Sequence, residues 1–438
     1  MTTTINNEHK KLNVPNKQEQ NQTCLDSAER EGLSPKGNVP NLRFPEFQGE
    51  WEKCKLGNIA NVTGGYAFKS DTLNSIGGKY QVVKMGNLYQ NQLDLHRSPS
   101  YTNILTSKAE NVILRKGDIA ITLTGTNNKR DFGYTYIFND EKNLLLNQRC
   151  GLIRTKGDPY FLSCLLKTYA FLNQFFESAT GGTGNQANVS TKAMEMFSVN
   201  TPSLKEQKKI GVLMALLDER IATQNKIIDK LQSLIKGIMA ELQKVGAEGG
   251  TWKKVFLSEV LTERNEHNTN LYQVFSVSVS QGVVNQVDYL GRSFAAKDTS
   301  KYNVAHYGDL VYTKSPTGSF PYGIVKQSLN SQKVAVSPLY GVYVPNSLAV
   351  GVYLHEYFMS EINTHNYLHP LIQKGAKNTI NITNQRFLEN CVLLPININE
   401  LLQISKLLRS LNNKIKYQQD ILQQYHKQKQ YLLRQMFI

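Results

Sequence analysis

The sequence has few cysteines, and none of them is spaced for a metal site or a disulfide framework. Cys24, Cys54, Cys150, Cys164 and Cys391 are odd in number and scattered, and no Cys-x-x-Cys pair occurs. A dispersed set of this kind is typical of proteins kept in a reducing cytoplasm, and it argues against structural zinc. We therefore expect a cytoplasmic protein without bound metal.

Motifs of several catalytic classes are also missing. No Gly-x-x-x-x-Gly-Lys-Ser/Thr phosphate loop occurs, so ATP-driven motion by this chain is not expected. Asp158-Pro159-Tyr160 matches only part of the [DN]PP[YF] motif of amino-methyltransferases, and a turn before a helix explains it. His365 and His369 have the spacing of helical metal ligands, but Pro370 interrupts the helix and favours a plain surface pair.

Acidic residues are in deficit, and long apolar runs are absent. The chain of 438 residues has 50 Lys and Arg against 35 Asp and Glu, a net charge of +15. Such a balance predicts an anionic partner, with nucleic acid as the first candidate. No apolar run approaches the roughly 18 residues that a membrane span needs, so no membrane partner is expected.

The most informative pattern is a long amphipathic segment that occurs twice. From 206 to 242 apolar residues recur at steps of four and three, and the same spacing returns 194 positions later. This is the seam of a coiled coil. We predict that the two copies pair antiparallel, with a glutamine of each near the middle fixing the register. The predicted seam residues are Ile210, Leu217, Ile221, Gln224, Ile228, Leu231 and Ile235 in the first copy, and Leu408, Leu411, Ile415, Gln418, Leu422 and Tyr425 in the second.

Each long segment follows a stretch of mixed strand and helix signals, and matched motifs appear there in the same order. Trp51 corresponds to Trp252, Gly117-Asp118 corresponds to Gly308-Asp309, and Pro202 corresponds to Pro395. Duplication explains this order better than chance does. We predict an α+β chain with an internal pseudo-twofold repeat, in which short helices lie at 160–167 and 352–361. The expected parts are a disordered or loosely attached segment at 1–40, globular domains at 41–201 and 247–394, and long helices at 202–246 and 395–438.

Polar loops carry the remaining chemistry. They combine Lys and Arg for phosphates, Asn and Gln for bidentate contacts to adenine, and Ser and Thr for either, which suits the reading of duplex DNA. For any single residue, an ordinary loop role remains the simpler explanation. The predicted contacts are Tyr66, Lys69, Thr124, Thr126, Asn127, Lys129, Arg130, Asn185, Gln186 and Asn188 in the first domain, and Arg264, Lys314, Thr317, Ser319, Tyr322, Lys374, Lys377, Asn378, Asn381 and Asn384 in the second.

Two DNA-reading domains on a rigid pair of helices predict a site in two parts. A helix of about 35 residues spans roughly 50 Å at 1.5 Å per residue. That length is comparable with one to one and a half turns of B-DNA at about 34–36 Å per turn. The helices would then set the length of the unread spacer.

The chain from about residue 41 to its end resembles the specificity subunit of type I restriction-modification enzymes. The resemblance is carried by TGGYAFKS from Thr63, KGDIAITLTGT from Lys116 with YGDLVYTKSPTGS from Tyr307, NVST and NITN, and the two proline-to-helix segments from Pro202 and Pro395. It implies two target recognition domains that each read half of a split, asymmetric site, and no cofactor or reaction in this chain.

The resemblance also implies partners. Two modification subunits would dock on the helices, bind S-adenosylmethionine and methylate adenine, and two restriction subunits would translocate and cut double-stranded DNA with ATP and Mg²⁺. Two other functions stay open on the residues alone: a self-contained DNA methyltransferase, and an adaptor whose coiled coil recruits proteins.

Overall fold

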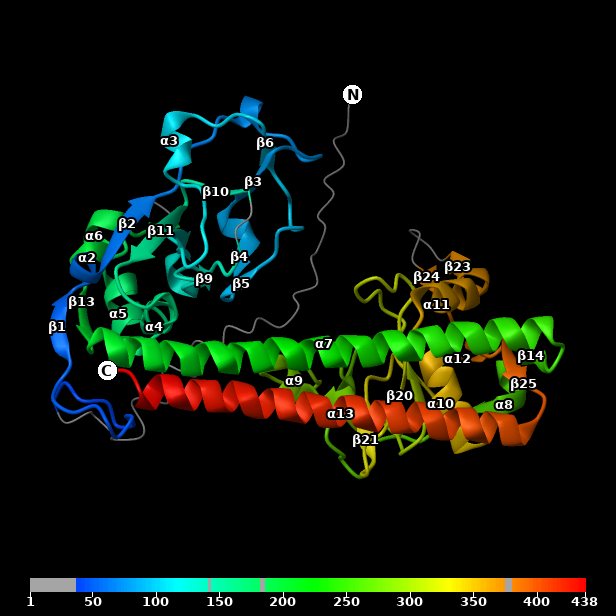
Figure 1. Cartoon of the computed structure of the whole chain (residues 1–438). Coiled ribbons are helices and arrows are strands. Elements are labelled where there is room, and N and C mark those ends of the chain that lie inside the picture. The colour runs from blue at the N-terminus through cyan, green and yellow to red at the C-terminus, as the bar shows by residue number, and fades with distance from the viewer. Residues whose placement is uncertain (1–36, 141–142, 182–185, 375–379) are drawn as a thin grey trace. The chain divides into compact units, whose positions relative to one another are not determined.

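The computed structural model describes residues 37–140, 143–181, 186–374 and 380–438 (Figure 1). Most of the predicted N-terminal segment, 1–36, lies outside these residues. The described chain forms two compact units. The first unit contains the residues up to Thr223 together with Leu422–Ile438, and the second contains Gln224–Ile421.

Two long helices, α7 (Leu204–Glu248) and α13 (Ile398–Gln435), each contribute to both units. They pair antiparallel, as predicted. In the second unit the side-chain amide of Gln224 donates to the backbone carbonyl oxygen of Gln418 at 2.9 Å. In the first unit Lys429 of α13 forms an ion pair with Asp218 of α7. All thirteen predicted seam residues are buried or half-buried.

A four-stranded antiparallel sheet lies at the centre of the first unit. Its strand order is β2 (Ala60–Gly64), β11 (Cys150–Thr155), β7 (Ile119–Thr122) and β9 (Thr135–Ile137). Around it lie the pairs β1 (Glu52–Lys55) with β13 (Ser198–Thr201) and β8 (Thr124–Thr126) with β12 (Gln186–Asn188), the sheet β10 (Leu144–Leu146), β3 (Tyr80–Val83) and β6 (Tyr101–Thr102), and the hairpin β4 (Leu88–Tyr89) and β5 (Gln92–Leu93).

Short helices close the first unit: α2 (Leu56–Ile59), α3 (Ser107–Glu110), α4 (Pro159–Leu165), α5 (Tyr169–Glu177) and α6 (Thr191–Glu195). The side chain of Asp158 caps α4 by accepting from the backbone N–H of Phe161, with Pro159 in the first turn. The beginning of α7 and the end of α13 belong to the same core, because Met214 and Phe437 are buried with Trp51 and Phe161.

The second unit repeats this plan. Its central sheet has the order β15 (Leu261–Glu263), β22 (Gly341–Pro345), β19 (Leu310–Tyr312) and β20 (Val325–Gln327), again antiparallel. The outer pairs are β14 (Trp252–Phe256) with β25 (Cys391–Pro395), β16 (Phe275–Ser278) with β17 (Gly282–Asn285), β18 (Asn303–Ala305) with β21 (Val334–Val336), and β23 (Gln373–Lys374) with β24 (Ile380–Asn381). The helices are α8 (Leu257–Val260), α9 (Gln286–Leu290), α10 (Leu348–Tyr357), α11 (Glu361–Leu368) and α12 (Asn384–Phe387).

Equivalent anchors join each domain to its long helix. The indole N–H of Trp51 donates to Glu206 of α7 at 3.3 Å, and that of Trp252 donates to Glu400 of α13 at 2.7 Å. Both glutamates lie in the first turn of their helix, where negative charge is favoured. The repeat seen in the sequence is therefore a repeat of contacts as well.

The prediction of a helix at 352–361 was wrong in its bounds. The helix α10 begins four residues earlier, because Ser347 caps it by accepting from the backbone N–H of Val350, and it ends at Tyr357. A second capping residue, Ser360, then starts α11, so the predicted span crosses a helix boundary. Among the described residues, no helix combines the length and the apolar character that crossing a membrane requires.

Candidate nucleic-acid interface

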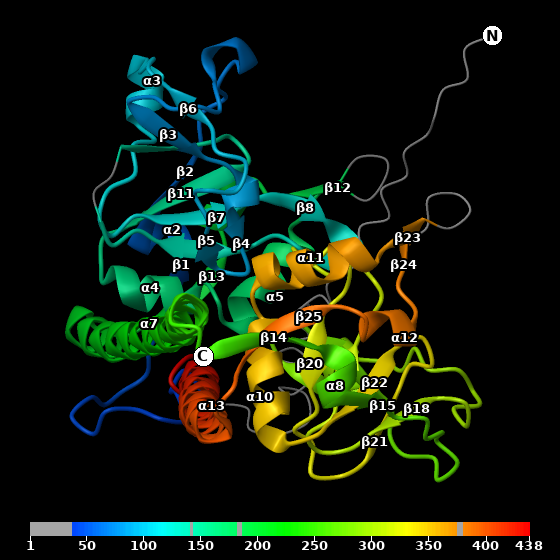
Figure 2. The same ribbon diagram turned by 90° about the vertical axis from the view of Figure 1, so that its right-hand side faces the viewer.

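In the first unit the pairing of β8 with β12 brings two predicted loops together (Figure 2). Thr126 lies opposite Gln186 and Thr124 lies opposite Asn188, and the hydroxyl of Thr124 donates to the side-chain oxygen of Asn188 at 3.1 Å. The sequence showed both loops as candidates but gave no sign that they join. Gln186 and Asn188 are exposed and Thr126 is half-buried, so they form one polar surface, whereas Thr124 is buried beneath it.

Two basic side chains follow β8 along the chain. Lys129 and Arg130 are exposed, and Arg130 adopts a positive φ of 45° in the turn that follows β8. Its guanidinium lies 5.1 Å from the centre of the Phe176 ring, a cation–π contact that orients the group. Lys69 is exposed after β2, and Tyr66 is half-buried with its ring edge-on to Phe68. The side chain of Asn127 and all of Asn185 lie outside the described residues.

In the second unit two of the predicted residues, Asn384 and Lys314, interact with a carboxylate that the sequence reasoning missed. The side-chain amide of Asn384 donates to Glu263 at 2.5 Å. Glu263 also acts electrostatically on Lys314, although burial outweighs it and lowers the pKa of Lys314. A glutamate is suited to accept from the amino group of cytosine, so Glu263 joins the candidate surface. In the sequence, the signal that could have pointed to Glu263 was its position next to the predicted contact Arg264.

The loop between β19 and β20 contacts α11. The hydroxyl of Ser319 donates to Glu361 at the start of α11, while Thr317 pairs with Phe320 in a tight turn. The ring of Tyr322 lies 5.3 Å from that of His365 and 5.9 Å from that of His369, measured between ring centres. The two histidines stack on each other and are exposed, and they lie just before β23.

Part of the second predicted loop is outside the described residues. This applies to Lys377 and Asn378, and to the side chains of Lys374 and Asn381. The backbones of the last two belong to β23 and β24, which pair antiparallel with Gln373 opposite Asn381. In the part of the chain that the structure describes, these strands form their own pair rather than joining the loop after β19.

Arg264 differs from the other predicted contacts because its guanidinium is bound within the domain. It donates to Asp309 through Nε at 2.6 Å and through Nη2 at 3.0 Å. Arg154 makes the equivalent two bonds to Asp118 in the first unit. Both aspartates also accept a backbone N–H in the turn that enters the buried strand. Arg264 thus has a place in the fold that is independent of any ligand.

Two exposed arginine–aromatic pairs were not predicted. Arg97 lies 5.8 Å from the ring centre of Tyr89, and Arg292 lies 4.4 Å from that of Phe294. Tyr89 is 40% exposed and Phe294 is 57% exposed, so part of each ring faces solvent. Such pairs combine a stacking face with a cation, which suits contact with nucleotides.

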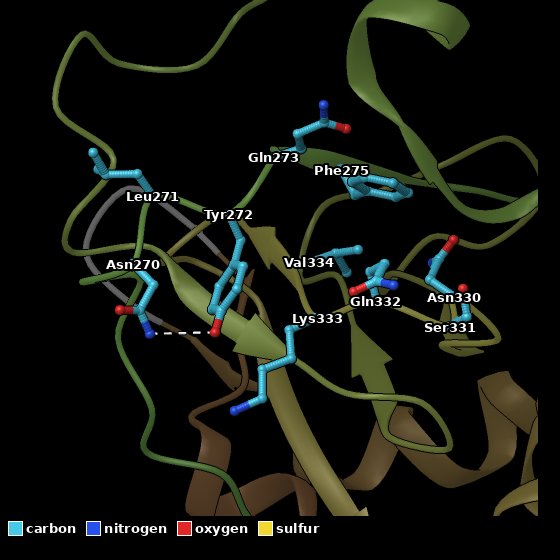
Figure 3. A pocket seen from close by; sticks show the side chains of 10 residues that line it. All are labelled: Asn270, Leu271, Tyr272, Gln273, Phe275, Asn330, Ser331, Gln332, Lys333 and Val334. Atoms are coloured by element: carbon cyan, nitrogen blue, oxygen red, sulfur yellow. Dashed lines mark hydrogen bonds between the residues drawn. The ribbon is translucent and has the colours of Figure 1, made fainter.

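The second unit also has a surface pocket of about 490 Å³ where the chain enters β16 and β21. Figure 3 shows amide side chains beside the rings of Tyr272 and Phe275, with Asn270 donating to the Tyr272 hydroxyl at 3.2 Å. None of the predicted residues lines it. Within the described residues, no three His, Cys, Asp or Glu side chains are grouped to hold a metal ion.

Comparison with known proteins shows what this duplicated fold is similar to. Residues 48–233 match the model of the type I restriction modification DNA specificity domain. The whole fold is similar to a type I restriction-modification S subunit from M. genitalium, with a TM-score of 0.59 and 12% identity over 91% of this chain and 99% of that one.

Curated relatives agree over part of their length. The EcoAI specificity subunit of Escherichia coli is 29% identical over 180 residues, 40% of this chain and 29% of that protein. A putative MjaX specificity subunit of Methanocaldococcus jannaschii is 24% identical over 51% of this chain and 52% of that protein. The matches thus span about half or less of these relatives. The chain is thus similar to type I restriction enzyme specificity subunits, in sequence over part of its length and in fold over most of it.

Proposed function

We propose that this chain is the DNA-specificity subunit of a type I restriction-modification complex. It reads a bipartite, asymmetric site on double-stranded DNA and directs adenine methylation or cleavage by partner subunits. The observation that carries the proposal is the duplication, because each unit presents its own polar and basic loops on the same sheet framework. Two separate DNA-reading domains require a DNA site in two parts.

The first unit reads its half-site with the joined surface of β8 and β12. Gln186 and Asn188 offer amide groups to base edges, while Lys129 and Arg130 offer charge to phosphates. In the second unit Lys314, Asn384 and Glu263 take the corresponding roles. The ligand in this proposal is chromosomal DNA, and the protein therefore acts in the cytoplasm.

The outward faces of the long helices support docking of two modification subunits. On α7 all the large exposed apolar residues except Leu204 at its start lie on one face of the helix, because they recur at steps of 4, 11, 7 and 11: Val212, Leu216, Ile227, Leu234 and Val245. On α13, Leu402, Tyr417 and Tyr431 are 15 and 14 residues apart, about four helical turns each, whereas the exposed Leu407 lies off this face. In this proposal the chain is non-catalytic. S-adenosylmethionine, ATP and Mg²⁺ are bound by the modification subunits and by two restriction subunits.

Sequence selection from random duplexes tests the proposal. The purified chain with its modification subunits is expected to enrich two fixed half-sites with an unread spacer, and the affinity should fall steeply as salt rises because phosphate contacts release counterions. Enrichment of one continuous motif, or retention without sequence preference, would reject it. Binding of S-adenosylmethionine by the chain alone would favour a self-contained methyltransferase instead.

Docking is tested separately. Ile227→Glu with Leu234→Glu places two charges on the exposed face of α7 and should abolish co-purification with the modification subunit. The matched control is Asn225→Glu with Gln232→Glu, which adds the same two charges, also seven residues apart, at exposed positions on the opposite side of the helix from the apolar row. If the first pair assembles normally, the docking face is elsewhere.

A further inference from the structure

Each domain places one ionisable side chain against its long helix at the same point of the repeat. In the first unit this residue is Lys167, the ninth residue after the capping Asp158 of α4. In the second unit it is Glu356, the ninth residue after the capping Ser347 of α10. The two positions are equivalent, but their charges are opposite.

The residue of the long helix near each of these side chains also differs, and its charge or hydrogen-bonding group suits the side chain that it meets. Lys167 donates to Ser163 at 3.2 Å, and of the charged groups on the long helices that act on it, Lys429 of α13 opposes its charge and Asp218 of α7 favours it. Asn412 of α13, which occupies the position equivalent to Asp218, donates its amide to Glu356 at 2.6 Å. A carboxylate of the helix therefore acts on the lysine, whereas an amide of the helix donates directly to the glutamate.

A neighbouring lysine completes each cluster. Lys429 of α13 pairs with Asp218 and lies close enough to Lys167 to oppose its charge. Lys326 of β20 acts on Glu356 and donates to the backbone oxygen of Val279 at 2.6 Å. Glu356 is 7% exposed and Lys326 is 3% exposed, whereas Lys167 is half-buried. Burial lowers the pKa of Lys167 and raises that of Glu356, so both charges depend on their neighbours.

We propose that two pairs of residues, Lys167 with Asp218 and Glu356 with Asn412, determine which recognition domain packs at which end of the helix pair. We call these two pairs the docking keys. A domain with a lysine at this point, placed at the second position, would bring its ammonium group to Asn412. No carboxylate of the helix is there to balance that charge. A domain built for the second would bring a carboxylate to Asp218. Mismatched charges at a partly desolvated contact are strongly disfavoured.

The keys restrict which domains can be placed at which position. A new first domain needs a cation at the ninth residue of the helix equivalent to α4, or a changed residue at 218. The consequence for DNA reading rests on the proposed function, since it fixes which half-site each end reads. The docking contact itself does not, and it is measured without DNA.

Swapping the residues of one pair for those of the other tests the proposal in the full chain. The readout is the rate of amide hydrogen exchange in peptides from α4 and α10. Glu356→Lys should raise exchange in α10 by about tenfold or more, since it puts a second cation beside Lys326. Adding Asn412→Asp recreates the set of two lysines and one aspartate found in the first unit, and should restore most of the protection.

The reciprocal exchange uses the first unit. Lys167→Glu should raise exchange in α4, by less than in α10 because the site is more exposed, and Asp218→Asn should reverse the change. Lys108→Glu, an exposed reversal on α3 of the same unit, is the control and should have no effect. The proposal is overturned if the paired variants are no better protected than the single ones, or if Glu356→Lys leaves α10 unchanged. Neither result would bear on DNA binding by the loops.

Discussion

Gln224 on α7 and Gln418 on α13 are bonded to each other across the second unit's helix pair. The amide of Gln224 donates to both the backbone and the side-chain oxygen of Gln418, and Gln224 is 7% exposed. A buried polar pair in an otherwise apolar seam lowers stability but selects one register, since any shift would leave the amides without partners.

This pair gives a first prediction. Gln224→Leu alone should lower the free energy of unfolding by about 1–3 kcal/mol, because it leaves the amide of Gln418 without its partner. Gln224→Leu with Gln418→Leu should recover that loss or exceed the natural chain, since two leucines pack in the seam. Urea unfolding followed by circular dichroism measures both. A double variant as unstable as the single one would show that the pair does not act as a unit.

A second prediction concerns the aspartates that precede the central strands. Arg154→Met should cost roughly 3 kcal/mol of stability, because Asp118 is 5% exposed and loses its cation. Arg154→Met with Asp118→Asn should be clearly more stable than the single variant. Thermal unfolding of the three proteins decides the matter, and an unstable double variant would place the cost in packing of the arginine rather than in charge.

A third prediction concerns pH. Burial, with the charge of Lys326, lowers the pKa of His355 to about 3, and its Nδ1 accepts from the backbone N–H of Gln327 at 3.0 Å. The imidazole is therefore neutral when folded. In the unfolded chain it takes up a proton below about pH 6.5, so its contribution is full above that pH and is lost as the pH falls towards 3.

His355→Asn, which keeps an acceptor but cannot titrate, should reduce the loss of stability between pH 6.5 and 4 by up to about 1.4 kcal/mol per pH unit. Urea midpoints across this range measure the slope. His96→Asn, at an exposed site in the first unit, is the control. An unchanged slope in His355→Asn would mean that His355 is protonated in the folded protein.

A fourth prediction separates phosphate contacts from base contacts in the first domain. Lys129→Glu with Arg130→Glu should weaken binding to every sequence and reduce the salt dependence by about one to two phosphate contacts. Gln186→Ala should instead relax the choice of base in one half-site by about 1–3 kcal/mol and leave the other half-site unchanged. Competition binding with single-base variants of the site measures both effects. Equal losses at both half-sites would remove Gln186 from base reading.

The sequence predicted the larger features because they depend on periodicity. Heptad spacing places Gln224 opposite Gln418 without any knowledge of the domains, and Gly117 and Gly308 adopt the positive φ values that their turns require. The pairing of β8 with β12 was not predictable, because a three-residue strand has too few side chains to show alternation. Glu263 was missed for a similar reason: its role depends on Asn384, which is brought near only by the fold.

Inserting one heptad into each of α7 and α13 tests the central claim most directly. Seven residues lengthen a helix by about 10.5 Å, and at about 3.4 Å per base pair this equals roughly three base pairs. Selection from random duplexes should then return the same two half-sites with a spacer about three base pairs longer. The original spacer, retained by the lengthened chain, would contradict the claim that the helices measure the distance between two DNA-reading domains.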